Sequence, residues 1–331
     1  MRHFAVILFS FGLATCVQAQ DNGTLEPADV LARSIPLNVR APEETKIGSL
    51  TYLGGLLVQS HAKGFAGWSG LAVSADGSQF LAVSDRAYWW TGRLVYTDGM
   101  LTGIASSHMA RVLDIYGDKL RTKTHRDAES LSIGPDGTAY VSFERNHRIK
   151  QFKPGDPSDL AYYATQPDKN IMVLGDMRKA PENNGVEAMA AFKDGSLMVL
   201  TQKYRDPRGH VYGWWRRDGK DIPIFYRTRS KYEPVAMDEL PNGDLLVLER
   251  QYTKKLGVSA NLCIVGQDQL KAEAVFDCAI IAQLAPPMNV DNFEAMAIRT
   301  AENGRTHIYI LSDDNENPEQ DTLLMMFELN R

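Results

Sequence analysis

The chain lacks the defining features of several common protein classes. Only three of its 331 residues are cysteine, too few for a small scaffold stapled by disulfides. Its 36 basic residues do not outnumber its 41 acidic ones, and the net charge of -5 argues against a nucleic-acid partner, which requires a clustered basic surface. Beyond the first 19 residues no apolar run is long enough to span a membrane, and few segments have helical periodicity. These absences leave an acidic chain built from short apolar segments.

The first 19 residues have the organisation of a secretory signal peptide. Arg2 and His3 form a positive start, Phe4–Thr15 is apolar but too short for a membrane span, and small residues lead up to Ala19. We therefore expect cleavage after Ala19 and a periplasmic or secreted protein. Two alternatives stay open, a lipoprotein modified at Cys16 and a retained membrane anchor.

Two cysteines remain in the exported part of the chain. Cys263 and Cys278 lie on two apolar runs, Leu262–Val265 and Ala274–Ile281, which flank a polar turn near Leu270. An antiparallel hairpin centred on that turn brings the two sulfur atoms opposite each other. We predict a disulfide, the expected state in an oxidising compartment. The alternative is a pair of buried thiols.

A segment recurs five times between residues 69 and 314. Each copy joins two short apolar runs through a turn that ends in glycine, and short strands with Asp-Gly or Asn-Gly hairpins indicate an all-β fold. The five turns are Asp76-Gly77, Asp136-Gly137, Asp194-Gly195, Asn242-Gly243 and Asn303-Gly304. Each repeat has room for two further strands, and four antiparallel strands form one blade of a β-propeller.

The last repeat ends one strand short of a blade. The β-rich segment Ile47–Gln59, which precedes the first repeat, is the natural strand to complete it and so to close the ring. We predict five four-stranded blades over residues 46–331, after an extended lead-in over residues 20–45. Six blades remain possible if the residues before Ile47 or the stretch Asp98–Arg121 add strands.

This arrangement places many charged residues at one mouth of the central channel, because the start of the first strand and the end of the second share one end of each hairpin. The predicted acidic and amide residues of this mouth are Glu129, Glu187, Glu233, Glu294, Asp85, Glu144, Gln202, Glu249 and Asp313. Basic residues follow four of the second strands, at Arg86, Arg145, Lys203 and Arg250. Glutamates that fix the geometry between blades are the alternative interpretation.

Clustered carboxylates are the hard oxygen ligands that Ca²⁺ and Mg²⁺ prefer. We predict a metal site for Ca²⁺ from Asp85, Glu129, Glu187, Glu233, Glu294, Asp313 and Asp314. The four basic residues are expected to bind an anionic substrate group. Glu129 and His125 are the candidate catalytic groups for general acid–base chemistry.

Several of these segments resemble a known family. Phe65–Leu71, Asp127–Leu131, Asp291–Met296, Ile310–Asn315 and Thr322–Phe327 are similar to the signature of the "esterase-like activity of phytase" family, with a resemblance that spans Lys46 to Leu329. It implies a secreted or periplasmic propeller that hydrolyses phosphoesters or other esters. Propeller phytases, by looser analogy, use Ca²⁺ at the channel mouth.

The sequence therefore favours a phytase-like hydrolase, in which a metal-activated water attacks a small anionic or ester substrate. Glu316 and Glu319 make the last rim loop acidic, which disfavours a polyanion such as phytate. We expect a monomer. The alternative function is a non-catalytic propeller that binds a small ligand or a protein at the same mouth.

Overall fold

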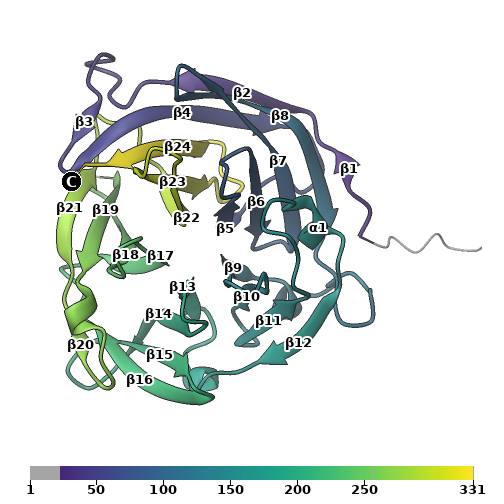
Figure 1. Ribbon diagram of the computed structural model, residues 1–331, viewed down its shortest axis with the longest axis vertical. Coiled ribbons are helices and arrows are strands. Elements are labelled where there is room, and N and C mark those ends of the chain that lie inside the picture. The colour runs from purple at the N-terminus through teal and green to yellow at the C-terminus, as the bar shows by residue number, and fades with distance from the viewer. Residues whose placement is uncertain (1–22, 256, 331) are drawn as a thin grey trace, which may run out of the picture.

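A computed structural model describes residues 23–255 and 257–330, so the predicted signal peptide, its cleavage site and Cys16 lie outside the described residues. Five small antiparallel sheets stand radially around one axis, with β5, β9, β13, β17 and β22 innermost (Figure 1). The predicted all-β, five-bladed propeller is thus confirmed. Within the described ranges, none of the helices is long and apolar enough to cross a membrane.

Blades 1, 2 and 3 take all their strands except β20 from residues 26–226. The strands of blade 1 are β5 (Trp68–Val73), β6 (Gln79–Ser84), β7 (Tyr88–Thr97), β8 (Met100–Arg111) and the short β1 (Glu26–Pro27). Those of blade 2 are β9 (Ala128–Ile133), β10 (Ala139–Phe143), β11 (Arg148–Phe152) and β12 (Asp168–Met172). Those of blade 3 are β13 (Val186–Ala191), β14 (Leu197–Arg205), β15 (Val211–Arg217), β16 (Lys220–Tyr226) and β20 (Val275–Phe276). The stretch that could have formed a sixth blade instead supplies β8, the long fourth strand of blade 1.

The last two blades complete the ring. Blade 4 consists of β17 (Glu233–Glu239), β18 (Leu245–Thr253), β19 (Gly257–Val265) and β21 (Ala279–Leu284). Blade 5 consists of β22 (Asn292–Thr300), β23 (Thr306–Asp313), β24 (Thr322–Leu329), β4 (Leu50–Ser60), β2 (Val30–Ile35) and β3 (Lys46–Ile47). Short helices occupy loops at η1 (Lys123–His125), α1 (Ala161–Ala164), η2 (Met177–Lys179) and η3 (Gln267–Gln269).

The ring closes as the sequence predicted, because β4 from the N-terminal part pairs with β24 from the C-terminal part. β2 then extends this blade beyond four strands by pairing with β4. Each of the two closing strands, β4 and β24, therefore has a paired neighbour on both sides. Unpaired strand edges invite aggregation, and closure of the ring removes them here.

The five predicted turns all adopt the left-handed glycine conformation, with φ between 77° at Gly77 and 87° at Gly243. In each turn the Asp or Asn side chain accepts a hydrogen bond from the backbone N–H two residues later, as Asp76 does from Ser78 at 2.9 Å. This turn chemistry explains why Asp-Gly and Asn-Gly recur at the same place in every blade.

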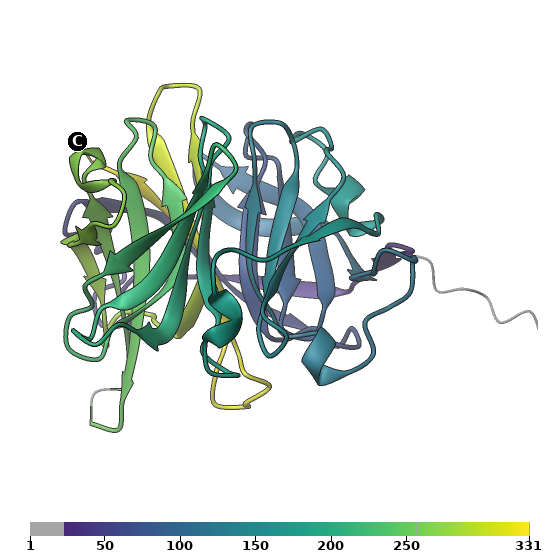
Figure 2. The ribbon, with the colours of Figure 1, turned by 90° about the horizontal axis from the view of Figure 1, so that it is seen from below.

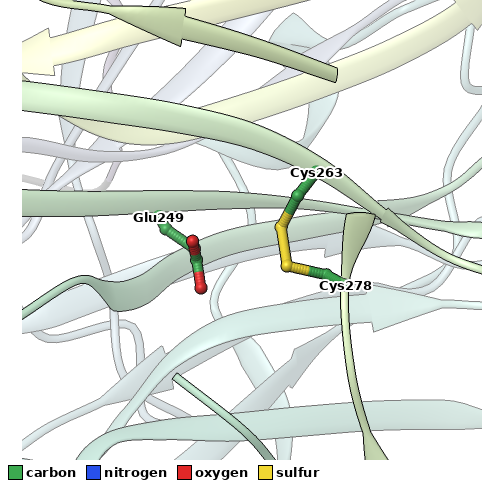
Figure 3. A group of neighbouring side chains, drawn as sticks. All are labelled: Glu249, Cys263 and Cys278. Atoms are coloured by element: carbon green, nitrogen blue, oxygen red, sulfur yellow. A yellow bond between two sulfur atoms is a disulfide. The ribbon is translucent and has the colours of Figure 1, made fainter. Parts of the chain in front are cut away.

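Cys263 and Cys278 form the predicted disulfide, with their Cα atoms 5.5 Å apart (Figure 3). The surrounding strands differ from expectation, since the predicted run Ala274–Ile281 is divided. Its first part, β20, joins the edge of blade 3 in parallel to β16, and its second part, β21, pairs with β19. The disulfide therefore sits where the chain passes between two blades.

Candidate functional site: an acidic channel mouth

Each innermost strand has a β-bulge near its start, one or two residues past the first residue that pairs with the second strand. The bulged residues, each left without a cross-strand partner, are Ser69, Glu129, Glu187, Val235 and Glu294. A small residue follows every bulge: Gly70, Ser130, Ala188, Ala236 or Ala295. At Gly70 even a Cβ atom would lie 2.7 Å from the backbone nitrogen of Leu131 in the next blade, so close packing between blades explains this requirement.

The pairing between the first and second strands of each blade ends at the residue two places before the bulge. The residues at that end are Asp85, Glu144, Gln202, Arg250 and Asp313, which face Gly67, Asp127, Gly185, Glu233 and Asn292 respectively. Together with the bulges these positions form the rim of one channel mouth. It lies at the lower end in Figure 2, where the loop between β23 and β24 projects beside η1 and η2.

The register of blade 4 differs from the one assumed from the sequence. Val235, not Glu233, occupies the bulge, and Arg250, not Glu249, occupies the rim position of the second strand. Glu249 instead points to the other face of the sheet, where it is fully buried near the disulfide (Figure 3) and accepts hydrogen bonds from Tyr226 and Asn261. Blade 4 thus contributes a cation where the others contribute a carboxylate or an amide.

The rim carboxyl groups of blades 1, 2, 3 and 5 are buried and lie close enough together to repel one another when ionised. Burial, with added repulsion from neighbouring carboxylates, raises the pKa of Asp313 to about 8 and of Asp85 to about 6. Burial also raises the pKa of Glu144 to about 7, against a hydrogen bond from the Gly185 backbone N–H. The pKa values of Glu129 and Glu187 are well above the usual range for the same reasons. So many like charges in one place favour a bound cation.

The tightest group of carboxylates belongs to blade 2. Ligand oxygens of Asp127, Glu129 and Glu144 all lie within 4.8 Å of one another. Oxygen donors at this spacing fit a hard divalent cation. Asp127 was missed as a ligand in the sequence analysis. Alignment of the repeats on the small residue after each bulge reveals it, because that alignment places Asp127 opposite Glu144.

The predicted basic residues separate into two groups. Arg86 pairs with Glu316 on the rim loop, and Arg145 pairs with Asp127 and donates to Asn183 at 2.8 Å. Lys203 and Arg250 lie beside the channel, where Lys203 contacts Glu233 at 3.2 Å and Arg250 contacts Glu294 at 3.0 Å. Blades 3 and 4 therefore each place one cation beside the channel, where it pairs with a glutamate of the following blade.

His125 and Asp314 lie at the edge of the mouth. The His125 side chain is exposed on η1, and its Nδ1 lies 2.6 Å from the hydroxyl of Thr122. Asp314 accepts a hydrogen bond from Thr322 at 3.1 Å, and burial raises its pKa. Neither residue belongs to the blade 2 group, so they are secondary candidates in the site.

The fold and this mouth define a five-bladed propeller with a carboxylate-rich rim at one end of its channel. The chain belongs to the phytase-like family described as "esterase-like activity of phytase", whose model matches residues 63–316. This confirms the resemblance seen in the sequence. No curated protein matches the chain.

Several solved structures are weakly similar to the chain, at low identity. A gluconolactonase from Xanthomonas campestris is 11% identical, with a TM-score of 0.45 and coverage of 92% of this chain and 95% of that one. A structure described as a putative gluconolactonase is 10% identical, with a TM-score of 0.42 and coverage of 93% and 100%. A protein of unknown function from Bacteroides caccae is 8% identical, with a TM-score of 0.34 and coverage of 76% and 70%. At these values the likenesses support no inference about activity.

Proposed function

We propose that the chain is an exported hydrolase of phosphate esters or related esters that uses a divalent cation, Ca²⁺, at its acidic mouth. The observation behind this proposal is the convergence of Asp127, Glu129 and Glu144 within 4.8 Å at the rim. Membership of the phytase-like family supports the hydrolase class. The Cys263–Cys278 disulfide is compatible with an oxidising compartment.

In this proposal Asp127, Glu129 and Glu144 hold the cation, and Asp85 and Glu187 complete the acidic surroundings. A bound cation would supply a Lewis acid that acidifies a water molecule and polarises the ester oxygen. The unfavourable burial of these carboxylates, evident from the raised pKa values of Glu129 and Glu144, would be relieved by the positive charge. The predicted ligands Glu294 and Glu233 do not belong to this group of three and pair with Arg250 and Lys203, so we place them outside the innermost set. Arg145 pairs with Asp127 and would have to share that carboxylate with the cation.

The chain's own side chains supply proton transfer and substrate binding. Burial and neighbouring carboxylates raise the pKa of Glu187, and a nearby bound cation would favour its ionised form, which would accept a proton from water. Water then adds to the phosphorus or acyl carbon, the bond to the ester oxygen breaks, and the departing alcohol takes up the proton from Glu187.

The anionic part of the substrate would lie over blades 3 and 4. Nε of Arg250 is buried and has no hydrogen-bond partner among the described residues, so it is available to a phosphate or carboxylate oxygen. Lys203, with about half of its side chain exposed, adds a second positive charge there.

The experiment is hydrolysis of p-nitrophenyl phosphate, bis-p-nitrophenyl phosphate and p-nitrophenyl acetate, with Ca²⁺ and after chelation. We expect turnover of at least one substrate that chelation abolishes and Glu129→Gln lowers by about 100-fold or more. Glu302→Gln, on an exposed turn at the other end of the molecule, is the matched control and should keep full activity. Activity that survives both chelation and Glu129→Gln contradicts the proposal, whereas ligand binding without turnover points to a binding propeller.

A further inference from the structure

A second cavity lies toward the end of the channel opposite the acidic mouth. It has a volume of about 390 Å³, within the range of small-molecule sites. Inner strands of blades 1, 2, 4 and 5 line it, together with Pro157 and Leu160 from the loop before α1. Its wall is mixed, with apolar side chains that include Leu131, Met237 and Met296 beside polar backbone and side-chain groups.

Asp238 is the one carboxylate among the described residues that line this cavity. The other charged residue of the lining is Arg299, whose guanidinium already binds the Tyr309 hydroxyl and Nδ1 of His307, each at 3.0 Å. Asp238 itself forms no ion pair among the described residues. The cavity therefore combines apolar side chains with one negative charge that has no cationic partner in the part of the chain that the structure describes.

The position of Asp238 in the repeat indicates that its charge is not required by the fold. The residues three places after each bulge are Ala72, Ser132, Ala190, Asp238 and Ala297. The hydroxyl oxygen of Ser132 accepts a hydrogen bond from the Ala191 N–H of the next blade at 2.9 Å, and a carboxylate oxygen of Asp238 accepts one from Ile298 N–H at 3.0 Å. A neutral hydroxyl oxygen is therefore sufficient to connect two blades at this position. In blades 1, 3 and 5 the residue is alanine, so no side-chain oxygen makes the connection there.

The surroundings leave the charge of Asp238 poorly compensated. Burial raises its pKa to about 7, although the backbone N–H groups of Ile298 and Glu239 donate to it. The nearby charged side chains are Glu239, which opposes ionisation, and Lys193, which favours it and whose ammonium donates to the Pro241 carbonyl. An ionised carboxylate in such a place gains most from a cation that enters the cavity.

We propose that this cavity binds a small organic ammonium ion, with the charged nitrogen at Asp238 and the carbon atoms against Leu131, Met237 and Met296. A single carboxylate is too few ligands for Ca²⁺, which takes six to eight oxygens, whereas an alkylammonium ion matches the charge and can place its carbon atoms against the apolar part of the wall. The site is separate from the acidic mouth, since Asp238 lies three residues, roughly 10 Å, farther along its strand than the bulge.

The test is calorimetric titration of the purified protein with choline and with 3,3-dimethylbutan-1-ol, which has the same shape without the charge. We expect saturable binding of choline and binding of the alcohol that is weaker by more than about tenfold. Equal affinities, or no choline binding to the wild-type protein, overturn the proposal.

Two variants distinguish the carboxylate from the cavity. Asp238→Ser keeps the oxygen that connects the blades, as Ser132 does in blade 2, and should fold normally but lose choline binding by more than about tenfold. Ala72→Leu fills the cavity from blade 1 with Asp238 intact and should also abolish binding. Glu129→Gln, at the other mouth, should leave choline binding unchanged even if it abolishes hydrolysis. Undiminished binding in both cavity variants refutes the site.

Discussion

At the scale of single residues, Gly67 determines where the rim carboxylate Asp85 can sit. Gly67 has a φ of 73°, and a Cβ atom there would lie on top of Oδ1 of Asp85. The backbone N–H of Asp85 donates to the Gly67 carbonyl at 2.8 Å, so the two residues cannot separate without breaking the end of the hairpin. A side chain at residue 67 must displace the carboxylate.

We therefore predict that Gly67→Ala lowers the free energy of unfolding by more than about 2 kcal/mol and weakens Ca²⁺ binding. The control is Gly99→Ala, where φ is 80° but nothing lies within 4 Å, so only the backbone strain of about 1 kcal/mol applies. Urea unfolding with and without Ca²⁺ measures both effects. Equal losses in the two variants would show that the contact with Asp85 is unimportant.

At the scale of elements, the pairing of β4 with β24 holds the ring closed. Leu56 lies at the centre of this pairing, fully buried and opposite Leu324. Leu31 on the neighbouring β2 is 67% exposed and offers the same substitution outside the core.

Leu56→Ala is predicted to reduce the free energy of unfolding by about 2–5 kcal/mol, because it leaves a cavity at the closing strand. Leu31→Ala should change it by less than about 0.5 kcal/mol. Denaturant titration checks both values, and a small loss in Leu56→Ala would mean that closure contributes little to stability.

The strands and turns of the structure also show which parts of the fold and of the site could be predicted from the sequence. The Asp-Gly turns and the alternating apolar runs were sufficient to predict five blades and their closure by β4. Turns and strands of this kind are determined by residues close together in the sequence. The sequence analysis assigned the wrong residues to the rim of blade 4. The position of a β-bulge sets which residues face the channel, and the order of charged residues along the sequence does not reveal that position. Glu233 looked equivalent to Glu129, yet Val235 takes that place and Arg250 replaces Glu249 at the rim. The packing requirement for a small residue after the bulge identifies the true register.

At the scale of the whole molecule, the acidic mouth makes stability depend on pH and on bound cations. The folded protein raises the pKa of Asp85 to about 6, of Glu144 to about 7 and of Asp313 to about 8, from ordinary values of 3.8, 4.5 and 3.8. A carboxyl group whose pKa is raised on folding binds its proton more tightly in the native state. Its contribution to stability is complete below about pH 4 and is lost as the pH rises through the folded pKa.

We accordingly predict that the metal-free protein loses thermal stability between about pH 5 and pH 8, and that Ca²⁺ restores it most strongly at pH 8, where the carboxylates are ionised. Thermal unfolding in chelator and in Ca²⁺ at the two pH values measures the difference. A Ca²⁺ effect that is the same at pH 5 as at pH 8 would contradict the assignment of the cation to these carboxylates.

The most direct test of the account is calorimetric titration of Ca²⁺ into the chelator-treated protein at pH 8. The account predicts saturable binding that Glu129→Gln weakens by about tenfold or more and that Glu302→Gln leaves unchanged. If the wild-type protein shows no saturable Ca²⁺ binding, or if Glu129→Gln binds it as tightly, the acidic mouth is not the metal site proposed here.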